Sequence, residues 1–533
     1  MSQSNRHSLE PGALGAARLI AWSGRWLLIY LLAMLVMWHI GIEAKYGNPT
    51  PFYALFWPLF PGPLTPILAV LAMAAAYYLV RRTFLETQAP VRRPLLRVLF
   101  AGFVLSLLFG LAAGGDHLAI NLVSLLPHLQ VIVLFVVGLQ LWAYVEKRDW
   151  LATARGRRLA WALGAVVLFA SLFAGSMAAL RGGFDGIADA YSRHQLEFSG
   201  DIGMGGSIRG LFGDYVSLHP HLSVHSKVHP PGPIALLWLF SYIVGRGALG
   251  LSLMTIVFGS LAVIPLFFWT RDLFGQRCAW TITLLYALMP SVVLFTATSA
   301  DILFMPFTVT TLFLFWRALH RPSAKYAVAA GVGYACMALL KFPLIGVGAF
   351  FGIVGLWRLT TAEHRRGVVQ TAVVMLASFL AVQVAVWAWS GFDIITTFWL
   401  SLEQFRTDQY YLDLMSPRYP AWTWRFLNPL AWVYFAGIPV TLLFLKRLRR
   451  PEPDTRALFI VFGLTLLALN FLYLARGEGE RSALYIFPFI AVPAGHLLDA
   501  FRRHEGSINP QAGAYAFLAF QTWLTESLFY MYW

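Results

Sequence analysis

Blocks of about 18 to 23 consecutive apolar residues recur along this chain, and they constrain its fold more than any other feature. A helix of that length spans the roughly 30 Å hydrocarbon core of a bilayer. The chain has 533 residues, of which 59% are hydrophobic and only 12% are charged. Soluble domains contain about 25% charged residues on average. The sequence therefore predicts an all-α polytopic membrane protein with about 14 to 15 transmembrane helices.

The apolar blocks divide the chain into three parts. We expect an N-terminal four-span module over 1–150, a core over 151–360 with a first outer loop at 181–247, and C-terminal spans over 361–533 with an outer loop at 390–428. The candidate spans, the last being the weakest, are roughly 22–42, 64–80, 95–113, 127–145, 159–180, 249–269, 279–296, 302–317, 325–340, 344–358, 367–389, 429–445, 456–475, 483–500 and 514–532.

The charge distribution predicts the orientation of these spans. The formal net charge is +15, from 40 Lys and Arg against 25 Asp and Glu. With the N-terminus in the cytoplasm, most basic residues fall in short inner loops, including "RRTFLETQAPVRR" and "KRLRRPEPDTR". Lys and Arg gather in cytoplasmic loops of membrane proteins, so the positive charge needs no nucleic-acid partner to explain it. The two long hydrophilic loops, 181–247 and 390–428, then lie outside.

This frame requires the stretch "PIALLWLFSYIVG" not to cross the membrane. It is only about 13 residues long, which is too short for a straight span. We interpret it as a helix in the membrane interface, begun by the preceding prolines and anchored by Trp238 and Tyr242. The alternative is a short tilted span, which would invert every later loop.

The first outer loop contains many of the candidate functional side chains. Its acids include Asp185, Glu197, Asp201 and Asp214, and long loops in compact proteins are usually functional. His221, His225 and His229 have the i, i+4, i+8 spacing of one helix face, but prolines flank this run and no HExxH motif is present. We therefore expect no metal site, and we interpret the histidines as structural or substrate-contacting.

Three charged positions lie at expected outer boundaries of spans. Asp301 stands between two spans with almost no loop, which indicates either a functional acid or a helix cap. Lys341 is either a cation of the site or a lysine whose ammonium reaches the interface. Arg481, near Glu478 and Glu480, belongs either to an anion site or to an exposed ion-paired turn.

Four motifs occur in an order that resembles a known family. They are "HPPGPIALLWLF", "FFWTRDLFGQR", "LLYALMPSVVLFTATSAD" and "MALLKFP", within about residues 159–360. The arrangement is similar to the GT-C superfamily of membrane glycosyltransferases. The family 39 type is most similar, with protein O-mannosyltransferases and lipid A aminoarabinose transferases among its relatives. The expected fold is thus GT-C-like, with interfacial helices in the outer loop. The four spans before residue 150 have no counterpart in the family core.

The resemblance implies transfer of a sugar from a polyprenyl-phosphate donor to an envelope acceptor, on the outer face of a bacterial inner membrane. A carboxylate base would invert the anomeric centre. The family's first-loop acid pair has no clear copy, because Gly186 follows Asp185. We expect Asp201 as the base, then Asp185, with Glu197 and Asp214 behind them. The substrate-binding candidates are Asp301, Lys341, Arg481, Glu478, Glu480, His229 and His225.

Two further expectations concern the site and its alternatives. We expect one cavity lined by the first outer loop, Asp301, Lys341 and Arg481, with the carrier phosphate between the two cations. No cofactor is predicted with certainty, although a divalent cation could assist the leaving phosphate. The rival functions are a flippase or transporter of lipid-linked saccharides, and a polysaccharide polymerase. A transporter usually carries its charges at mid-membrane near broken helices, whereas the acids here gather at one interface.

Overall fold

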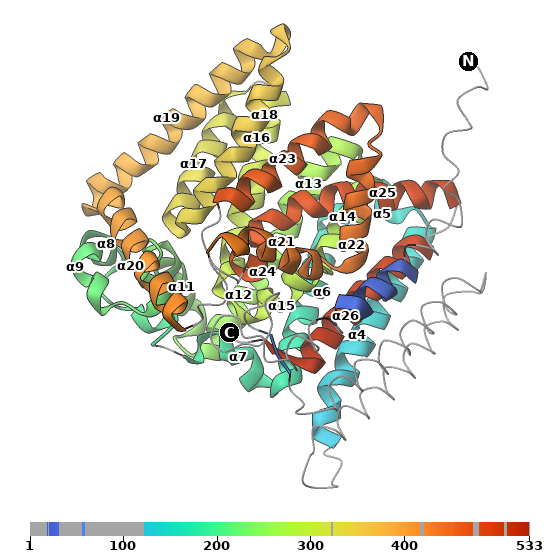
Figure 1. The fold of residues 1–533 in the computed structure, drawn as a ribbon, viewed down its shortest axis with the longest axis horizontal. Helices are drawn as coiled ribbons and strands as arrows, with labels where there is room; N and C mark the ends of the chain where they lie inside the picture. Colours follow the sequence, from blue (N-terminus) through green and yellow to red (C-terminus); the bar gives the residue numbers. More distant parts are fainter. Residues whose placement is uncertain are drawn as a thin grey trace.

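The computed structural model describes residues 19, 21–30, 33, 56–58, 122–193, 195–320, 323–415, 421–472, 479–505 and 509–531. Almost all of this part is helical, which confirms the expected all-α membrane fold (Figure 1). The two described strands, β1 (Phe56–Pro58) and β2 (Phe529–Met531), form one short antiparallel ribbon. The expected spans at 64–80 and 95–113 lie outside the described residues, so the four-span N-terminal module stays a prediction.

Eight helical segments of the described chain are long and apolar enough to cross a membrane. They are Pro127–Lys147 of α4 (Leu122–Lys147), α6 (Arg157–Ala178), α12–α13 (Ala248–Ser260 and Val263–Phe274), η6–α16 (Ala300–Phe304 and Met305–His320), η7–α18 (Phe342–Val347 and Gly348–Leu359), η8–α19 (Ala362–His364 and Arg365–Ser390), η10–α23 (Pro453–Thr455 and Arg456–Leu472) and Leu484–Arg503 of η11–α25 (Leu484–Ile486 and Phe487–Glu505). The chain is thus an integral membrane protein.

Two expected spans are broken. The block at 279–296 forms α14 (Gln276–Ala287) and α15 (Pro290–Thr298), bent by 54°, because Pro290 begins a new helix. The block at 429–445 forms α21 (Trp424–Phe435) and α22 (Ile438–Arg449), bent by 113°. Gly437 lies between the second pair with φ 89°, a conformation that favours glycine. Two helices rather than one therefore cover the block at 429–445.

Two other blocks differ from the eight long segments. The block at 325–340 forms α17 (Ala324–Leu340), a shorter apolar helix of 17 residues that packs along α16. The block at 514–532 lies mostly in α26 (Asn509–Leu528), which is not among the helices apolar enough to cross a membrane. Gln511, Gln521 and Glu526 of α26 are buried in the protein interior. This helix is therefore built to pack against protein rather than lipid.

The first outer loop folds into a chain of short helices. In sequence they are η3 (Ala179–Arg181), α7 (Phe184–Ser192), η4 (Phe198–Asp201), α8 (Ile208–Gly213), α9 (Tyr215–Leu218), η5 (His219–His221), α10 (Val224–Lys227) and α11 (Gly232–Val244). Ser207 caps α8, since its hydroxyl accepts a hydrogen bond from the Gly210 amide at 3.0 Å. Gly205, with φ 74°, lies against the Leu211 backbone, so a Cβ there would clash.

Helix α11 has the length expected for the stretch "PIALLWLFSYIVG". It begins directly after Pro231 and ends at Gly245, whose φ is 77°. Tyr242 is 72% exposed, as an interfacial anchor should be. Trp238 is only 4% exposed and packs in the core, so its expected role as an anchor is wrong. One face of α11 therefore holds the outer loop to the bundle while the other carries apolar residues at the surface.

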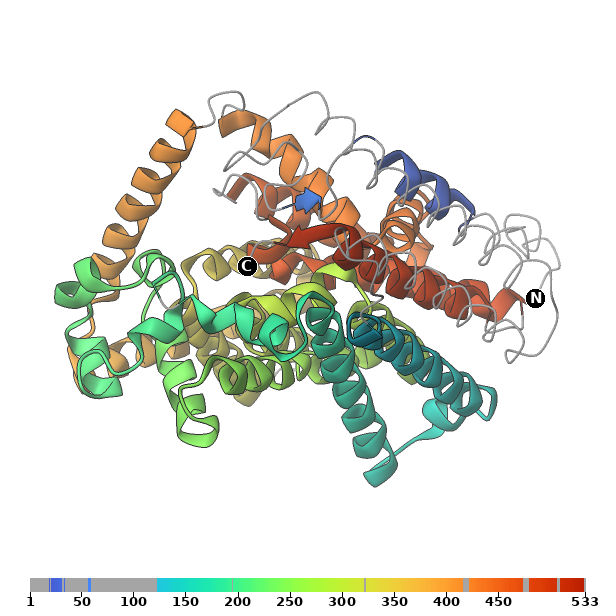
Figure 2. The same cartoon turned by 90° about the horizontal axis from the view of Figure 1, so that it is seen from below.

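The outer-loop helices gather at one side of the molecule. In Figure 2 they lie beside α20 (Ile394–Met415), which projects beyond the bundle. Short segments complete the chain: α5 (Trp150–Thr153), η9 (Ala421–Thr423) and α24 (Gly479–Ser482). The described parts of both outer loops thus meet on one face, next to the start of η6 and to α24.

The predicted orientation can be tested at two exposed positions in a background that lacks Cys278 and Cys336. Ser217→Cys lies in the first outer loop, and Thr361→Cys lies between α18 and α19. We expect an impermeant maleimide to label the first variant in sealed right-side-out vesicles, and the second only after lysis. Labelling in the opposite order would show that the orientation of the spans is the reverse of the predicted one. Ser226 is unsuitable for this test because it is fully buried.

Candidate functional site

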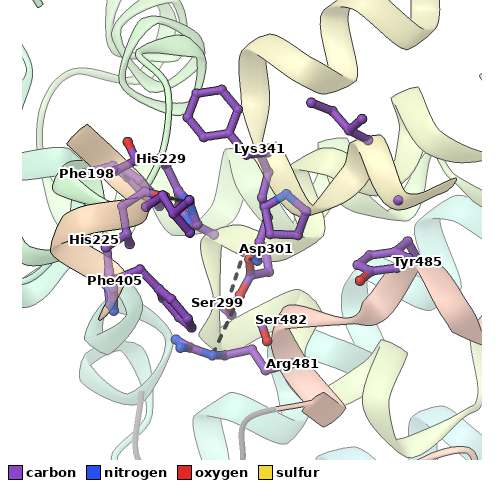
Figure 3. Close-up of a pocket in the computed structure, with 18 of the residues that line it drawn as sticks. Phe198, His225, His229, Ser299, Asp301, Lys341, Phe405, Arg481, Ser482 and Tyr485 are labelled. Atoms are coloured by element: carbon purple, nitrogen blue, oxygen red, sulfur yellow. Dashed lines mark hydrogen bonds and ion pairs between the residues drawn. The ribbon is translucent and has the colours of Figure 1, made fainter. Parts of the chain in front are cut away.

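A cavity of about 460 Å³ lies where the outer-loop helices, η6, η7, α20 and α24 meet (Figure 3). One part of its wall is polar. The polar lining residues are Glu197, His225, His229, Ser299, Asp301, Lys341, Ser401, Arg481, Ser482 and Tyr485. The rest of the wall is largely apolar and comes mainly from η7, α20 and α23. The volume lies within the range of ordinary small-molecule sites.

Asp301 is the centre of the polar wall. It is in the first turn of η6, where its amide donates to the Ser299 hydroxyl at 3.1 Å and its carboxylate accepts from that hydroxyl at 3.2 Å. Lys341 donates a short hydrogen bond to one carboxylate oxygen. The Nε of Arg481 lies 3.6 Å from the other oxygen. The Ser299 cap is therefore present, and it is compatible with the interpretation of Asp301 as a functional acid.

The chain positions both cations by ending helices at the cavity. Helix α17 ends at Leu340, and Lys341 continues in extended conformation before Pro343. The Lys341 side chain is only 4% exposed, so it is held inside rather than extended to the interface. Arg481 comes from the one-turn helix α24 and is also buried. Asp301, Lys341 and Arg481 thus share one cavity, as expected from the sequence.

Glu197 brings a second carboxylate to the same cavity. It precedes η4, and its Oε2 lies 3.3 Å from Nδ1 of His225. The His225 amide donates to the carbonyl of Leu196 at 3.1 Å, which holds the two segments side by side. Phe198 stacks on His229 with ring centroids 5.5 Å apart. The outer loop therefore presents a carboxylate–imidazole pair to the cavity that Asp301 also lines.

His229 contributes a neutral imidazole. Burial, reinforced by the charge of Lys341, lowers the pKa of His229 to about 3. Its Nδ1 lies 2.7 Å from the Val228 carbonyl, so this nitrogen carries the proton and donates it. Nε2 is then left as an acceptor. His229 can accept a hydrogen bond from a hydroxyl group, but it adds no positive charge for an anion.

The other acids of the first loop do not line this cavity. Asp201 is 2% exposed and accepts hydrogen bonds from Ser223, from the amide at 3.1 Å and from the hydroxyl at 2.7 Å. Asp185 in α7 and Asp214 after α8 are both exposed. The structure therefore separates Asp201, the acid ranked first from sequence, from the cavity and places Glu197 there.

The remaining candidates are placed as follows. Glu480 is buried in α24 but is not among the lining residues, and Glu478 lies outside the described residues. The histidine run does not form one helix face, because η5 ends at His221 and α10 begins at Val224. Within the described part of the chain, no three His, Cys, Asp or Glu side chains converge as a metal site would require.

Sequence reasoning missed the contribution of the second outer loop. Phe398, Ser401 and Phe405 of α20 line the cavity. Their spacing of three and four residues places them on one helix face, which is a signal present in "FWLSLEQF". Tyr485 and Ser482 also line the cavity, and nothing in their local sequence distinguishes them from packing residues.

The cavity brings together three kinds of chemical group. Two buried cations can bind an anion, a carboxylate can take a proton, and an apolar wall can hold a hydrocarbon chain. The sum of the charges on Asp301, Lys341 and Arg481 is one positive charge. This net charge is complementary to a phosphodiester, which carries one negative charge.

Part of this chain is similar to known proteins. Residues 228–389 match the family described as dolichyl-phosphate-mannose-protein mannosyltransferase. No curated protein matches the chain in sequence. Among solved structures, ArnT from Cupriavidus metallidurans in the apo state is similar at 14% identity and TM-score 0.38, over 61% of this chain and 72% of that one. The family match confirms the resemblance to GT-C membrane glycosyltransferases and supports glycosyl transfer as the activity of this chain.

Proposed function

We propose that this glycosyltransferase moves a sugar from a polyprenyl-phosphate donor to an envelope acceptor at the outer face of the membrane. The observation that carries the proposal is the single cavity in which Glu197 faces the cluster of Asp301, Lys341 and Arg481. A lipid-linked sugar phosphate needs a cationic site, a proton acceptor and an apolar groove close together. All three are present within this cavity.

The donor's phosphate fits beside Lys341 and Arg481. Asp301 already holds both side chains in position, so the phosphate meets a preorganised site rather than two mobile cations. When the bond from the sugar to the phosphate breaks, the carrier phosphate gains negative charge. The two cation side chains are themselves largely buried, so they stabilise that charge more strongly than cations in bulk water would.

The carrier's hydrocarbon chain fits the apolar wall. Phe342 and Ile345 of η7 line the cavity together with Leu469 and Leu472 of α23, and both η7–α18 and α23 are helices apolar enough to cross a membrane. Ile345 is 39% exposed and Leu472 is 57% exposed, so this wall continues to the molecular surface. A prenyl chain can leave the cavity there and enter the bilayer.

Glu197 is the proposed general base. It takes the proton of the acceptor hydroxyl, whose oxygen attacks the anomeric carbon opposite the phosphate. The bond between that carbon and the phosphate oxygen breaks, and its electron pair stays on the phosphate. One displacement inverts the anomeric centre. His225, at 3.3 Å, holds the carboxylate in place, and neutral His229 can position a sugar or acceptor hydroxyl.

The base assignment predicts a selective loss of turnover. Glu197→Gln keeps the shape and the contact with His225 but removes the proton acceptor. We expect turnover of a polyprenyl-phosphate sugar to fall about 100- to 10,000-fold, with an unchanged melting temperature. Release of the free carrier phosphate measures turnover and also separates an enzyme from a flippase, which would release none. Normal turnover in this variant would exclude Glu197 as the base.

Asp201→Asn provides the matching test of a structural role. One carboxylate oxygen becomes an NH2 group, which would face the Ser223 amide donor to donor, so we expect a loss of about 1–3 kcal/mol in unfolding free energy. The folded fraction should keep turnover near the wild-type value, and exposed Asp214→Asn should change neither quantity. An intact fold with abolished turnover would identify Asp201 as the base instead.

The cation cluster predicts different effects on stability and on binding. Lys341→Gln leaves Asp301 with one cation fewer, so we expect a loss of about 3 kcal/mol or more in stability. The double variant Asp301→Asn/Lys341→Gln removes one charge of each sign and should recover part of that stability, since Arg481 still loses its contact with the carboxylate. Its affinity for a polyprenyl phosphate should still be roughly tenfold to a hundredfold weaker. Wild-type affinity in the stable double variant would contradict a phosphate role for Lys341.

A further inference from the structure

A second apolar groove, of about 450 Å³, lies between the N-terminal part of the described bundle and the core. Its walls are α4 and α6, with α5, α14 and Tyr515 of α26 closing it. Gly138 allows close approach here, because a Cβ at this position would clash with the ring of Phe169. Leu141 and Trp161 line the groove and are 61% and 76% exposed, so it opens to the surface.

The groove occupies one end of the bundle. Its lining residues lie in the C-terminal half of α4, from Phe135 to Val145, and in the N-terminal half of α6, from Trp161 to Phe169. Both halves adjoin the loop 148–156. Helix α14 lines the groove, whereas Ser299 and Asp301 at the far end of α15 line the catalytic cavity. The groove and the catalytic cavity are therefore separate sites on the α14–α15 pair, and no described residue lines both.

The mouth of the groove carries positive charge. Five basic residues there are exposed: Lys147, Arg148, Arg155, Arg157 and Arg158. The acids of the same loop are already neutralised, since Glu146 pairs with Arg502 and Asp149 pairs with Arg277. The first turn of α6 has no acidic residue and no side-chain cap, so its amide groups add to the positive potential. This loop attracts an anion.

We propose that this groove and loop bind an anionic phospholipid of the bilayer. One acyl chain lies between α4 and α6, and the phosphate head group lies at the basic loop. Trp150 and Trp161 fit the boundary between the two, because tryptophan favours the level of the head groups. Basic clusters at the inner ends of transmembrane helices attract anionic lipids in this way. The site is independent of the catalytic cavity.

Native mass spectrometry tests the proposal on the full-length protein. The protein is delipidated in mild detergent and titrated with phosphatidylglycerol, which is anionic, or phosphatidylcholine, which is neutral overall. We expect one phosphatidylglycerol to bind, and to bind more tightly than phosphatidylcholine. Arg157→Gln/Arg158→Gln should weaken phosphatidylglycerol roughly thirtyfold, given the contribution of each basic residue near a membrane surface, and leave phosphatidylcholine unchanged.

A second pair of variants tests the groove itself. Ala165 lines the groove on α6, and Ala165→Phe should fill it and abolish binding of both lipids. Two controls lie at exposed positions of α19: Arg365→Gln/Arg366→Gln for charge and Val373→Phe for bulk. Neither control should change the binding of either lipid.

Three results would overturn the proposal. Equal binding of the two lipids would remove the role of charge. Equal effects of the Arg157/Arg158 and Arg365/Arg366 variants would remove the role of this loop. The third result has two parts: the wild-type protein binds neither lipid, and the Ala165→Phe variant has a lower melting temperature than the wild type. That result would show that the chain itself fills the groove, with the apolar ranges 64–80 and 95–113 as the candidates.

Discussion

The buried carboxylate of Asp301 is the interaction on which the site depends. A lone charge at this depth would be costly, so the fold must bring cations to it. Lys341 follows α17 and Arg481 belongs to α24, two elements far apart in the sequence. Their convergence fixes the ends of these elements around the start of η6. The same convergence creates a positive net charge at the bottom of the cavity, so one electrostatic requirement shapes both the local fold and the proposed phosphate site.

A second buried carboxylate organises the outer loop. Asp201 accepts hydrogen bonds from the amide and the hydroxyl of Ser223, which ties η4 to the segment before α10. Tyr215 reinforces this arrangement, since its hydroxyl lies 2.8 Å from the carbonyls of both Ser226 and His229. The loop is thereby folded so that Glu197, His225 and His229 reach the cavity. Asp201 acts on the site through the shape of the loop.

Much of this fold could be predicted because membrane burial leaves a strong sequence signal. Apolar blocks located most described spans, and the prolines before α11 located its start. The bend between α21 and α22 could not be predicted, since the signal of Gly437 and Pro439 competes with a continuous apolar block. The shared cavity of Asp301 and Arg481 followed from the cost of buried charge. The sequence could not show whether Glu197 or Asp201 reaches the cavity. The turn η4 lies between the two acids, and no periodic pattern indicates which of them faces the cavity.

The surroundings of the two cavity carboxylates also give them different chemistry. Asp301 is bound by Lys341, Arg481 and the Ser299 hydroxyl, so its lone pairs are engaged by cations and a donor. A carboxylate in that state is a weak proton acceptor, and its work is to hold the cations in position. Glu197 has His225 at one oxygen, and the cavity lies beside it. Neutral His229 adds no cation that would compete for either carboxylate. The proposed base and the acid that contacts the cations are therefore distinct, and they come from different elements of the fold.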